Sequence, residues 1–388
     1  MNRAAVRFWG LAYVLLILLT GTNLATPLYG LYQSRFGFAA STVTLVFAVY
    51  VGTLIPALLL AGPLADAVGR RAVLLPAVAV AALGAGIFAY ADSTSMLFLG
   101  RAVQGLSVGA ASGALTAAIA DAEPSGDQRK ASLVATAASV GGLGLGPLVA
   151  GLLAELTPWP LLAPFLFELL ALAPAIFAVL AIPASRTRNR WRPTMPRPPA
   201  GGRGMFWMSA AASFLAFSVT GLFLALAPSY VQLLSGQRSL ILAGAVVALM
   251  IGASVVAQLI GADRITPHSQ VPGLVVLAVG LIALAVSGLW GSLPLLLVAA
   301  VVAGIGQGVV FLGGLGEITR LAPTEQRAAV VSAFYVMVYL GVGVPVIGVG
   351  ILATFVELLT AVVVFSVVVA AGCLITAGVL RPLLGRAS

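Results

Sequence analysis

Ionisable residues are scarce in this chain, so those expected inside apolar segments are the first candidates for chemistry. Charged residues make up 8% of the sequence and hydrophobic residues 61%. Glu168 lies near the middle of one apolar stretch, and Glu317 lies close to the end of another. A carboxyl group that is protonated and desolvated in turn can carry a proton across an apolar layer. Glu168 and Glu317 are therefore the candidates for proton coupling.

Each carboxylate also has a static alternative. Arg101 is expected at a depth comparable with Glu168, so the two could form a structural ion pair as readily as Glu168 could carry a proton. Glu317 stands three residues before Arg320, a spacing that favours an ion pair on one helix face. Arg101 either faces the interior of a helix bundle or extends toward the nearer membrane surface.

The elements that must position these residues are membrane-spanning helices. The mean hydropathy is +1.12, and apolar runs of about 20 residues recur along all 388 residues. The period-two alternation of a transmembrane β-barrel is absent. We expect an all-α membrane protein with 12 transmembrane helices in two pseudo-symmetric six-helix bundles. The spans are expected at 8–29, 42–61, 72–91, 95–120, 130–154, 160–182, 206–230, 240–260, 271–290, 293–319, 327–351 and 355–380.

A basic, proline-rich stretch divides the chain. Residues 185–204 lack apolar periodicity and are predicted to form a cytoplasmic linker between a bundle at 1–184 and a bundle at 205–388. The two halves carry a weak repeat, because the segment beginning at Gln128 aligns with the segment beginning at Gln326, and Pro147 then meets Pro345. A duplicated unit predicts a substrate site near mid-membrane where the halves meet.

The basic residues predict the topology. Nearly all of the 20 arginine and lysine residues fall in alternate loops, with Arg35 and Arg238 on the opposite side and Arg101 within a span. This asymmetry places both termini in the cytoplasm of a multi-pass protein of the plasma (inner) membrane. It also accounts for the net charge of +9 without a nucleic-acid partner.

Several classes of function are disfavoured. Cys373 is the only cysteine, which argues against a disulfide framework or a thiolate metal site. Lys130 is the only lysine and does not follow a glycine, so the sequence has no phosphate-binding P-loop. We expect no metal, no cofactor and no enzymatic activity. The expected partners are a small-molecule substrate, protons and the lipid bilayer, and the expected state is a monomer.

Three stretches have recognisable spacing. The first runs from Gly62 to Arg71, the second begins at Arg101, and the third spans Gly142 to Gly151. Their key residues are Gly62, Leu64, Asp66, Gly69, Arg70 and Arg71 in the first, Arg101, Gln104 and Gly105 in the second, and Gly142, Gly146, Pro147 and Gly151 in the third. In the first stretch the glycines allow a tight turn between two spans.

With these stretches the chain resembles the major facilitator superfamily, in particular its 12-span drug/proton antiporter branch. The three stretches are similar to that family's motifs A, B and C. The resemblance implies that Asp66 and Arg70 act in a gate on the cytoplasmic side, with Asp66 accepting hydrogen bonds from an arginine or from a helix of the other half. Ala67 stands where many members have arginine, and the first span offers Asn23 where many antiporters have a carboxylate.

The third motif implies proton-linked export by alternating access. Uptake by a symporter or uniporter of the same fold is the alternative, and a non-transporting receptor or scaffold is a remote one. The polar and aromatic residues of the spans suit a hydrophobic small molecule or drug better than a sugar or phosphate. The cavity candidates are Asn23, Tyr29, Gln104, Phe217, Phe311 and Tyr335.

Overall fold

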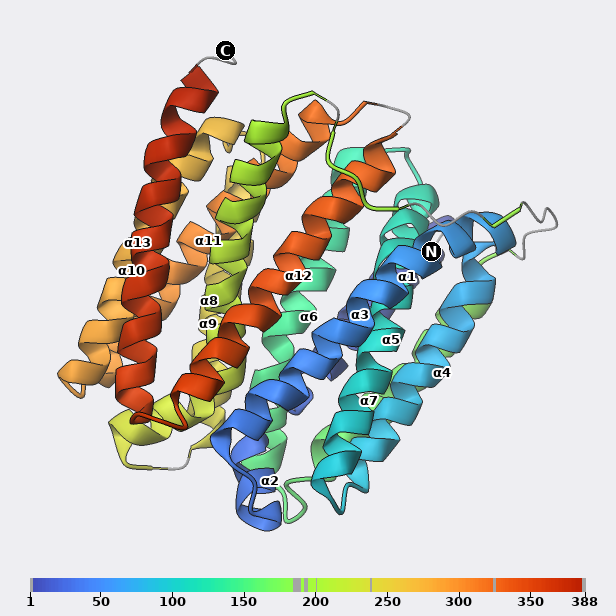
Figure 1. The fold of residues 1–388 in the computed structure, drawn as a ribbon. Coiled ribbons are helices and arrows are strands. Elements are labelled where there is room, and N and C mark those ends of the chain that lie inside the picture. The colour runs from blue at the N-terminus through green and yellow to red at the C-terminus, as the bar shows by residue number, and fades with distance from the viewer. Residues whose placement is uncertain are drawn as a thin grey trace. The chain divides into compact units, whose positions relative to one another are not determined.

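The computed structural model of the chain describes residues 3–183, 190–191, 195–199, 201–237, 239–323 and 326–385, which form helices joined by turns and loops. Twelve helical segments are long and apolar enough to cross a membrane, as the sequence predicts (Figure 1). The structure separates into two compact units, Met1–Phe38 with Val46–Thr194 and Ala39–Leu45 with Met195–Ser388. Arg238, residue 184 and part of the predicted linker, at 185–189, 192–194 and 200, lie outside the described residues.

Each half of the chain contributes a set of helices. The first half of the chain forms α1 (Arg3–Leu24), α2 (Tyr29–Phe36), α3 (Ala40–Val68), α4 (Arg70–Ala89), α5 (Thr94–Ala122), α6 (Gln128–Leu156) and α7 (Ala163–Leu180). The second half forms α8 (Arg203–Ser235), α9 (Leu240–Gly261), the short η1 (Pro267–Ser269), α10 (Gln270–Leu289), α11 (Leu293–Leu321), α12 (Arg327–Leu352) and α13 (Leu358–Gly385). Helix α8 begins inside the predicted linker, because the left-handed Gly202 already ends the irregular segment.

The first span is longer than predicted and is broken. It runs over Ala4–Phe36, and α1 and α2 are separated by a turn at residues 25–28. Pro27 has no amide hydrogen to give to the Asn23 carbonyl. The amide of Thr26 bonds to that carbonyl instead, at 3.1 Å and only three residues back. The carbonyl of Thr22 thereby loses its usual helical donor.

The Gly62–Arg71 stretch is mostly helix, which corrects the prediction of a loop. Gly62, Leu64 and Asp66 lie in the last turns of α3, and α4 starts at Arg70. Gly69 alone makes the turn, with a φ of 94° that side-chain-bearing residues avoid. A single residue therefore redirects the chain from one span to the next.

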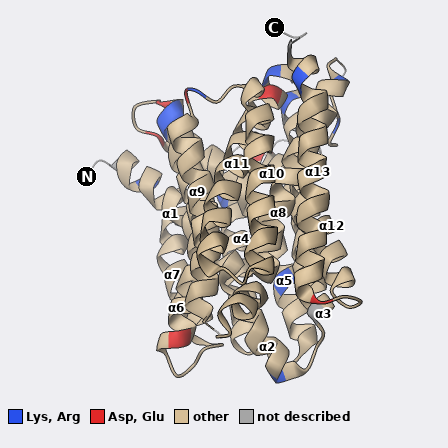
Figure 2. Ribbon diagram, turned by 90° about the vertical axis from the view of Figure 1, so that its left-hand side faces the viewer, with Lys and Arg blue, Asp and Glu red and all other residues tan. Residues whose placement is uncertain are grey.

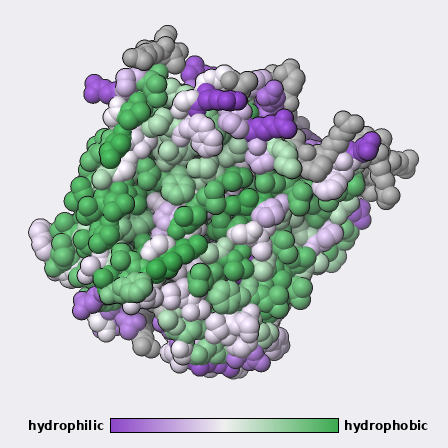
Figure 3. All heavy atoms as spheres, viewed as in Figure 1, coloured by the Kyte–Doolittle hydropathy of each residue, from purple (hydrophilic) through white to green (hydrophobic). Residues whose placement is uncertain are grey.

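The outer surface of the helices is apolar, as contact with lipid requires. Large side chains such as Leu170, Phe177 and Ile375 are 68%, 73% and 68% exposed. The face in Figure 3 is hydrophobic along the middle of the helices and hydrophilic toward their two ends. Charged residues are likewise concentrated near helix ends in Figure 2. Such a surface would be costly in water but suits a bilayer.

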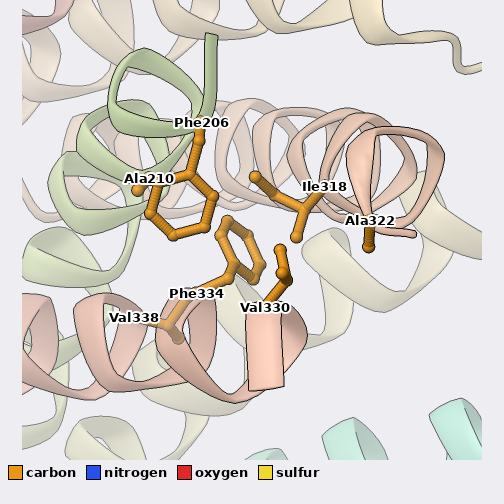
Figure 4. Packing of buried hydrophobic residues seen from close by; sticks show 7 residues of the cluster. All are labelled: Phe206, Ala210, Ile318, Ala322, Val330, Phe334 and Val338. Carbon is orange, nitrogen blue, oxygen red and sulfur yellow. The ribbon is translucent and has the colours of Figure 1, made fainter. Parts of the chain in front are cut away.

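Each unit has its own core. In the second unit, Phe206 and Ala210 of α8 pack against Ile318 of α11 and against Val330 and Phe334 of α12 (Figure 4). In the first unit, α1 packs closely on α6. A methyl group added at Gly142 would lie 2.5 Å from the carbonyl oxygen of Leu16, and one at Gly146 would meet the carbonyl oxygen of Thr20.

The connection between α5 and α6 is organised by Glu123. Its carboxylate accepts hydrogen bonds from Nζ of Lys130 at 2.8 Å and from the amides of Ser125 and Asp127 at 2.7 and 2.9 Å. The Lys130 ammonium also lies 5.4 Å from the ring centre of Phe8 in α1. The Lys130 ammonium and these amides together lower the pKa of Glu123 to about 2, although burial opposes them.

We predict that Gly142→Ala destabilises the protein by about 1–3 kcal/mol, because the added methyl group forces α1 and α6 apart. Thermal unfolding of the purified protein can be followed by the reaction of a maleimide dye with Cys373, the single and buried cysteine. Gly141→Ala is the matched control, since a methyl group there would meet only Cδ1 of Leu16, at 3.8 Å. Equal unfolding midpoints for the two variants would contradict the close crossing.

We also predict that Glu123→Gln lowers stability at neutral pH and that the difference from the unmodified protein shrinks in acid. The folded-state pKa of about 2 lies below the ordinary value of 4.5, so the stabilisation is complete above about pH 4.5 and is lost as the pH falls toward 2. Unfolding midpoints measured across this range test the prediction. Glu357→Gln, at an exposed position, is the control, and a pH-independent gap for Glu123→Gln would refute the ion-pair account.

Candidate functional site

The interior of the first unit is arranged around Arg101 of α5, whose side chain is completely buried. Its Nε donates to the hydroxyl of Tyr29 at 2.5 Å, and its Nη1 donates to the carbonyl of Thr22 at 2.5 Å and to Oε1 of Gln104 at 3.2 Å. The Thr22 carbonyl is available because the helix breaks just beyond it. Arg101 thus caps the end of α1, where the helix dipole favours a cation. The alternative of an arginine extending to the surface is wrong.

Aromatic rings surround the same guanidinium. Its central carbon lies 5.4 Å from the ring centre of Tyr29, 5.7 Å from Phe47, 5.6 Å from Tyr50 and 5.9 Å from Phe88. Ring faces attract cations, and more strongly where water is excluded. Neutral oxygens and ring faces therefore hold the buried charge, and Nη2 of Arg101 remains without a hydrogen-bond partner.

Glu168 is placed by α7 in the same interior and is 2% exposed. Its Oε1 lies against Gly21 of α1 at the position that a side chain there would occupy, and its Oε2 has no hydrogen-bond partner. Gln104 donates to the Gly21 carbonyl at 3.3 Å, so it connects this part of α1 to Arg101. Among the described residues, Arg101 and Glu168 form no direct ion pair, and the static-pair alternative lacks the contact it requires.

Asn23 of the first span and the residues of the third motif serve packing. Nδ2 of Asn23 donates to the carbonyl of Leu143 at 3.0 Å, and its Cβ lies beside Gly146. Gly142, Gly146, Pro147 and Gly151 are all buried on α6. The third motif is therefore the surface on which α1 rests. Gly105 of the second motif similarly brings α5 against Tyr50 of α3.

The first motif lines a pocket at one end of the first unit. The pocket has a volume of about 450 Å³, and Arg7, Asp66, Arg70 and Asp121 are its charged lining residues. Arg70 pairs with Asp121 and also donates to the carbonyl of Ala117 at 2.8 Å. The sequence suggested an arginine beside Asp66; the structure pairs Arg70 with Asp121 instead, because the start of α4 faces the last turn of α5.

In the second unit the expected Glu317–Arg320 ion pair is present. Nε and Nη2 of Arg320 donate to the two carboxylate oxygens at 3.0 and 2.8 Å. The carboxylate is fully buried, while the arginine side chain is 53% exposed. Glu317 has a permanent cationic partner and Glu168 has none, so the two candidates for proton coupling differ in kind.

Aromatic side chains form a continuous ladder across α8, α11 and α12. Phe217 meets Phe311 edge to face at 5.1 Å, Phe311 stacks on Phe334 at 6.2 Å, and Tyr335 lies 6.3 Å from Phe311 and 6.4 Å from Tyr339. The cavity candidates thus divide into separate groups. Tyr29 and Gln104 bond to Arg101, Asn23 packs against α6, and Phe217, Phe311 and Tyr335 share the ladder.

One polar cluster lies outside the predicted site residues. Ser254 of α9 contacts the side-chain amides of Gln258 and of Gln307 on α11. A signal was available, because Gln307–Gly308 repeats the Gln104–Gly105 pair of the first half. Within the described part of the chain, no group of three histidine, cysteine or acidic side chains is arranged to hold a metal ion.

Known proteins resemble this chain in both sequence and fold. A bacillibactin exporter of Bacillus subtilis is 26% identical over 162 residues, which cover 40% of each chain. The puromycin resistance protein pur8 of Streptomyces alboniger is 36% identical over 165 residues, 39% of this chain and 31% of the relative. Quinolone resistance protein NorA of Staphylococcus aureus is 26% identical over 38% of each. The chain spans two fifths or less of the length of these relatives.

Solved structures match over nearly the whole chain. A POT family transporter in complex with 5-aminolevulinic acid has a TM-score of 0.79 at 13% identity and covers 98% of this chain and 96% of that one. A bacterial homologue of the human lysosomal transporter Spinster, inward-facing and occupied, has a TM-score of 0.75 at 16% identity and covers 100% and 97%. At such identities these structures bear on the fold alone.

The sequence also matches a family model. The model described as Major Facilitator Superfamily matches residues 11–270, well over half of the sequence. With twelve membrane-spanning helices and relatives named as exporters and resistance proteins, the chain belongs to the Major Facilitator Superfamily of membrane transporters.

Proposed function

We propose that this transporter exports a hydrophobic small molecule in exchange for protons by alternating access. It would act as a monomer in the plasma (inner) membrane with both termini in the cytoplasm, as the distribution of its arginines favours. We further propose that residues 1–184 and 205–388 act as two functional halves joined by the linker 185–204.

The observation that carries the proposal is the state of Glu168. It is a buried carboxyl group with an unpartnered oxygen and no cation within bonding distance. A lone carboxylate in an apolar interior is costly, whereas the protonated form is tolerated. Glu168 can therefore bind a proton when it is reached from one side of the membrane and release it to the other, with no other bond made or broken.

Arg101 would couple this proton to the helix break. While Glu168 is protonated, Arg101 is held by the Thr22 carbonyl, the Tyr29 hydroxyl and Gln104. When Glu168 loses its proton, the new carboxylate attracts the unpartnered Nη2 of Arg101. Any movement of the guanidinium weakens its bond to Thr22 and changes the support of the break between α1 and α2. A charge change is thereby converted into helix movement.

The substrate class follows from the aromatic ladder and from the relatives. Phe217, Phe311 and Tyr335 are only partly buried and offer ring faces rather than charges. Surfaces of this kind bind apolar and aromatic molecules. Relatives named for puromycin resistance, quinolone resistance and bacillibactin export support export over uptake. One proton moving across about 150 mV supplies roughly 3.4 kcal/mol, enough for a gradient of about 300-fold.

The first motif would form the gate. Arg70 and Asp121 tie α4 to α5, while Asp66 lines the same pocket and makes no hydrogen bond or ion pair within the described residues. A carboxylate left free at a helix end can accept a contact in one conformational state and release it in another. We propose this role for Asp66, with Arg70 holding the adjacent helix in position.

We predict that Glu168→Gln abolishes substrate-induced dissipation of a pH gradient in everted vesicles, because the amide cannot carry a proton. Binding of lipophilic compounds should persist, since glutamine keeps the shape of the side chain. Glu357→Gln is the matched control at an exposed site, and it should behave like the unmodified protein. Undiminished dissipation by Glu168→Gln would exclude Glu168 as the carrier.

We predict that Asp66→Asn reduces transport about tenfold or more while expression and insertion stay normal, since the variant loses the charge and not the volume. Asp92→Asn, at an exposed position between α4 and α5, controls for loss of an acidic side chain. Initial rates of compound efflux from intact cells provide the measurement. A fully active Asp66→Asn variant would remove the gating role.

A further inference from the structure

A serine hydroxyl joins two buried glutamines in the second unit. Oγ of Ser254 accepts a hydrogen bond from Nε2 of Gln258 at 3.0 Å and donates one to Oε1 of Gln307. Ser254 is 1% exposed and each glutamine 5%. No charged group takes part. The three side chains form a neutral polar cluster on two helices that are otherwise almost wholly apolar.

The Ser254 hydroxyl determines which atom of each glutamine amide remains without a hydrogen bond. A serine hydroxyl has one hydrogen to donate, so here one amide gives its nitrogen to Ser254 and the other gives its oxygen. The free ends are then Oε1 of Gln258, an acceptor, and Nε2 of Gln307, a donor. If both amides were turned over, the two bonds would reverse and the free ends would again be one acceptor and one donor.

These free ends have no partner but remain accessible. Neither makes a further hydrogen bond within the described part of the chain, and neither is among the polar atoms that are completely enclosed. A donor and an acceptor without partners in an apolar setting favour any ligand that satisfies both. Each side chain is more than nine-tenths buried, so little freedom is left to lose on binding.

The packing of α9 on α11 fixes the geometry. A methyl group added at Gly308 would lie 2.5 Å from the Ser254 carbonyl oxygen and 3.0 Å from its Oγ, so only glycine lets the two helices meet here. Gln307 precedes this glycine. Phe311 follows Gln307 by one helical turn and therefore shares its face of α11. The amide pair thus adjoins the aromatic ladder through Phe311.

We propose that the free ends of Gln258 and Gln307 recognise a carboxamide or lactam group on an aromatic or other apolar molecule. Such a group carries a carbonyl acceptor beside an N–H donor, the complement of what the two glutamines offer. The ladder receives the apolar part through Phe311. The inference rests on the proposed function, because it takes this ligand to be the transported molecule. A substrate site of this kind would select for an amide group in addition to binding apolar surface.

The test is equilibrium binding to the purified full-length chain in detergent, with uptake by empty micelles subtracted. The probes are 2-naphthamide and methyl 2-naphthoate, which share the ring system and the carbonyl but differ in the N–H donor. We expect the amide to bind about tenfold more tightly, the upper range of the effect of one net hydrogen bond. An amide-to-ester ratio near one, or no binding of either probe up to its solubility limit, would overturn the proposal.

Two variants locate the effect. Gln258→Met removes the acceptor for the N–H that only the amide probe has, so it should bring the ratio toward one and leave ester binding unchanged. Ser254→Ala removes the hydroxyl that orients both amides and should also bring the ratio toward one. Gln232→Met makes the same change at an exposed position of α8 and should keep the ratio. An unchanged amide-to-ester affinity ratio in both test variants would refute the assignment of amide recognition to this cluster. If a variant fails to fold, the ratio in the unmodified protein still decides.

Transport is scored separately. Everted vesicles carrying the unmodified protein are tested for dissipation of a pH gradient on addition of each probe. Selective amide binding without dissipation would refute proton-coupled export and leave the recognition site standing. Dissipation by amide and ester alike, together with equal binding, would refute the recognition site and leave export standing.

Discussion

The interaction on which the first unit depends is the contact between a buried guanidinium and the end of a broken helix. Placing Arg101 in an apolar bundle is costly unless its donors are satisfied, and a helix that stops inside the membrane leaves carbonyls that are equally costly. The break that Pro27 imposes frees the Thr22 carbonyl, and Arg101 bonds to it. The hydrogen bond satisfies both a donor of the buried guanidinium and the unpaired carbonyl. The aromatic rings around Arg101 complete the arrangement by excluding water.

The second unit uses the same type of helix crossing for a different purpose. Gly105 packs on Tyr50 of α3, and Gly308 packs on Ser254 of α9, with a glutamine directly before each glycine. In the first unit that glutamine, Gln104, supports a charge. In the second unit no arginine lies one turn away, since Gly304 occupies the place of Arg101, and Gln307 joins a neutral cluster instead. The two crossings are thus alike in their glycine contact while their polar content differs.

Much of this architecture could be predicted from the sequence, because hydrophobic length determines membrane spans and the i, i+3 spacing of Glu317 and Arg320 fixes an ion pair. Contacts between segments that are distant in the sequence were harder to predict. Nothing local indicates that Arg70 pairs with Asp121, or that Arg101 bonds to a backbone carbonyl rather than to Glu168. The glycines and the proline between Gly62 and Arg71 predict a loop, although Gly69 alone suffices for the turn. The break in the first span was not predicted, although Pro27 was an available signal for it.

The different polar contents imply a division of labour under the proposed function. Proton exchange needs a group whose charge can change without a fixed counter-ion, and Glu168 in the first unit meets that condition, whereas Glu317 is tied to Arg320. Discrimination among neutral molecules needs oriented donors and acceptors that keep their state as protons come and go. The Ser254 cluster consists of an alcohol and two amides, none of which titrates in the physiological range. Separating the two chemistries in this way would let the affinity for a neutral substrate stay constant while the charge of the first unit alternates.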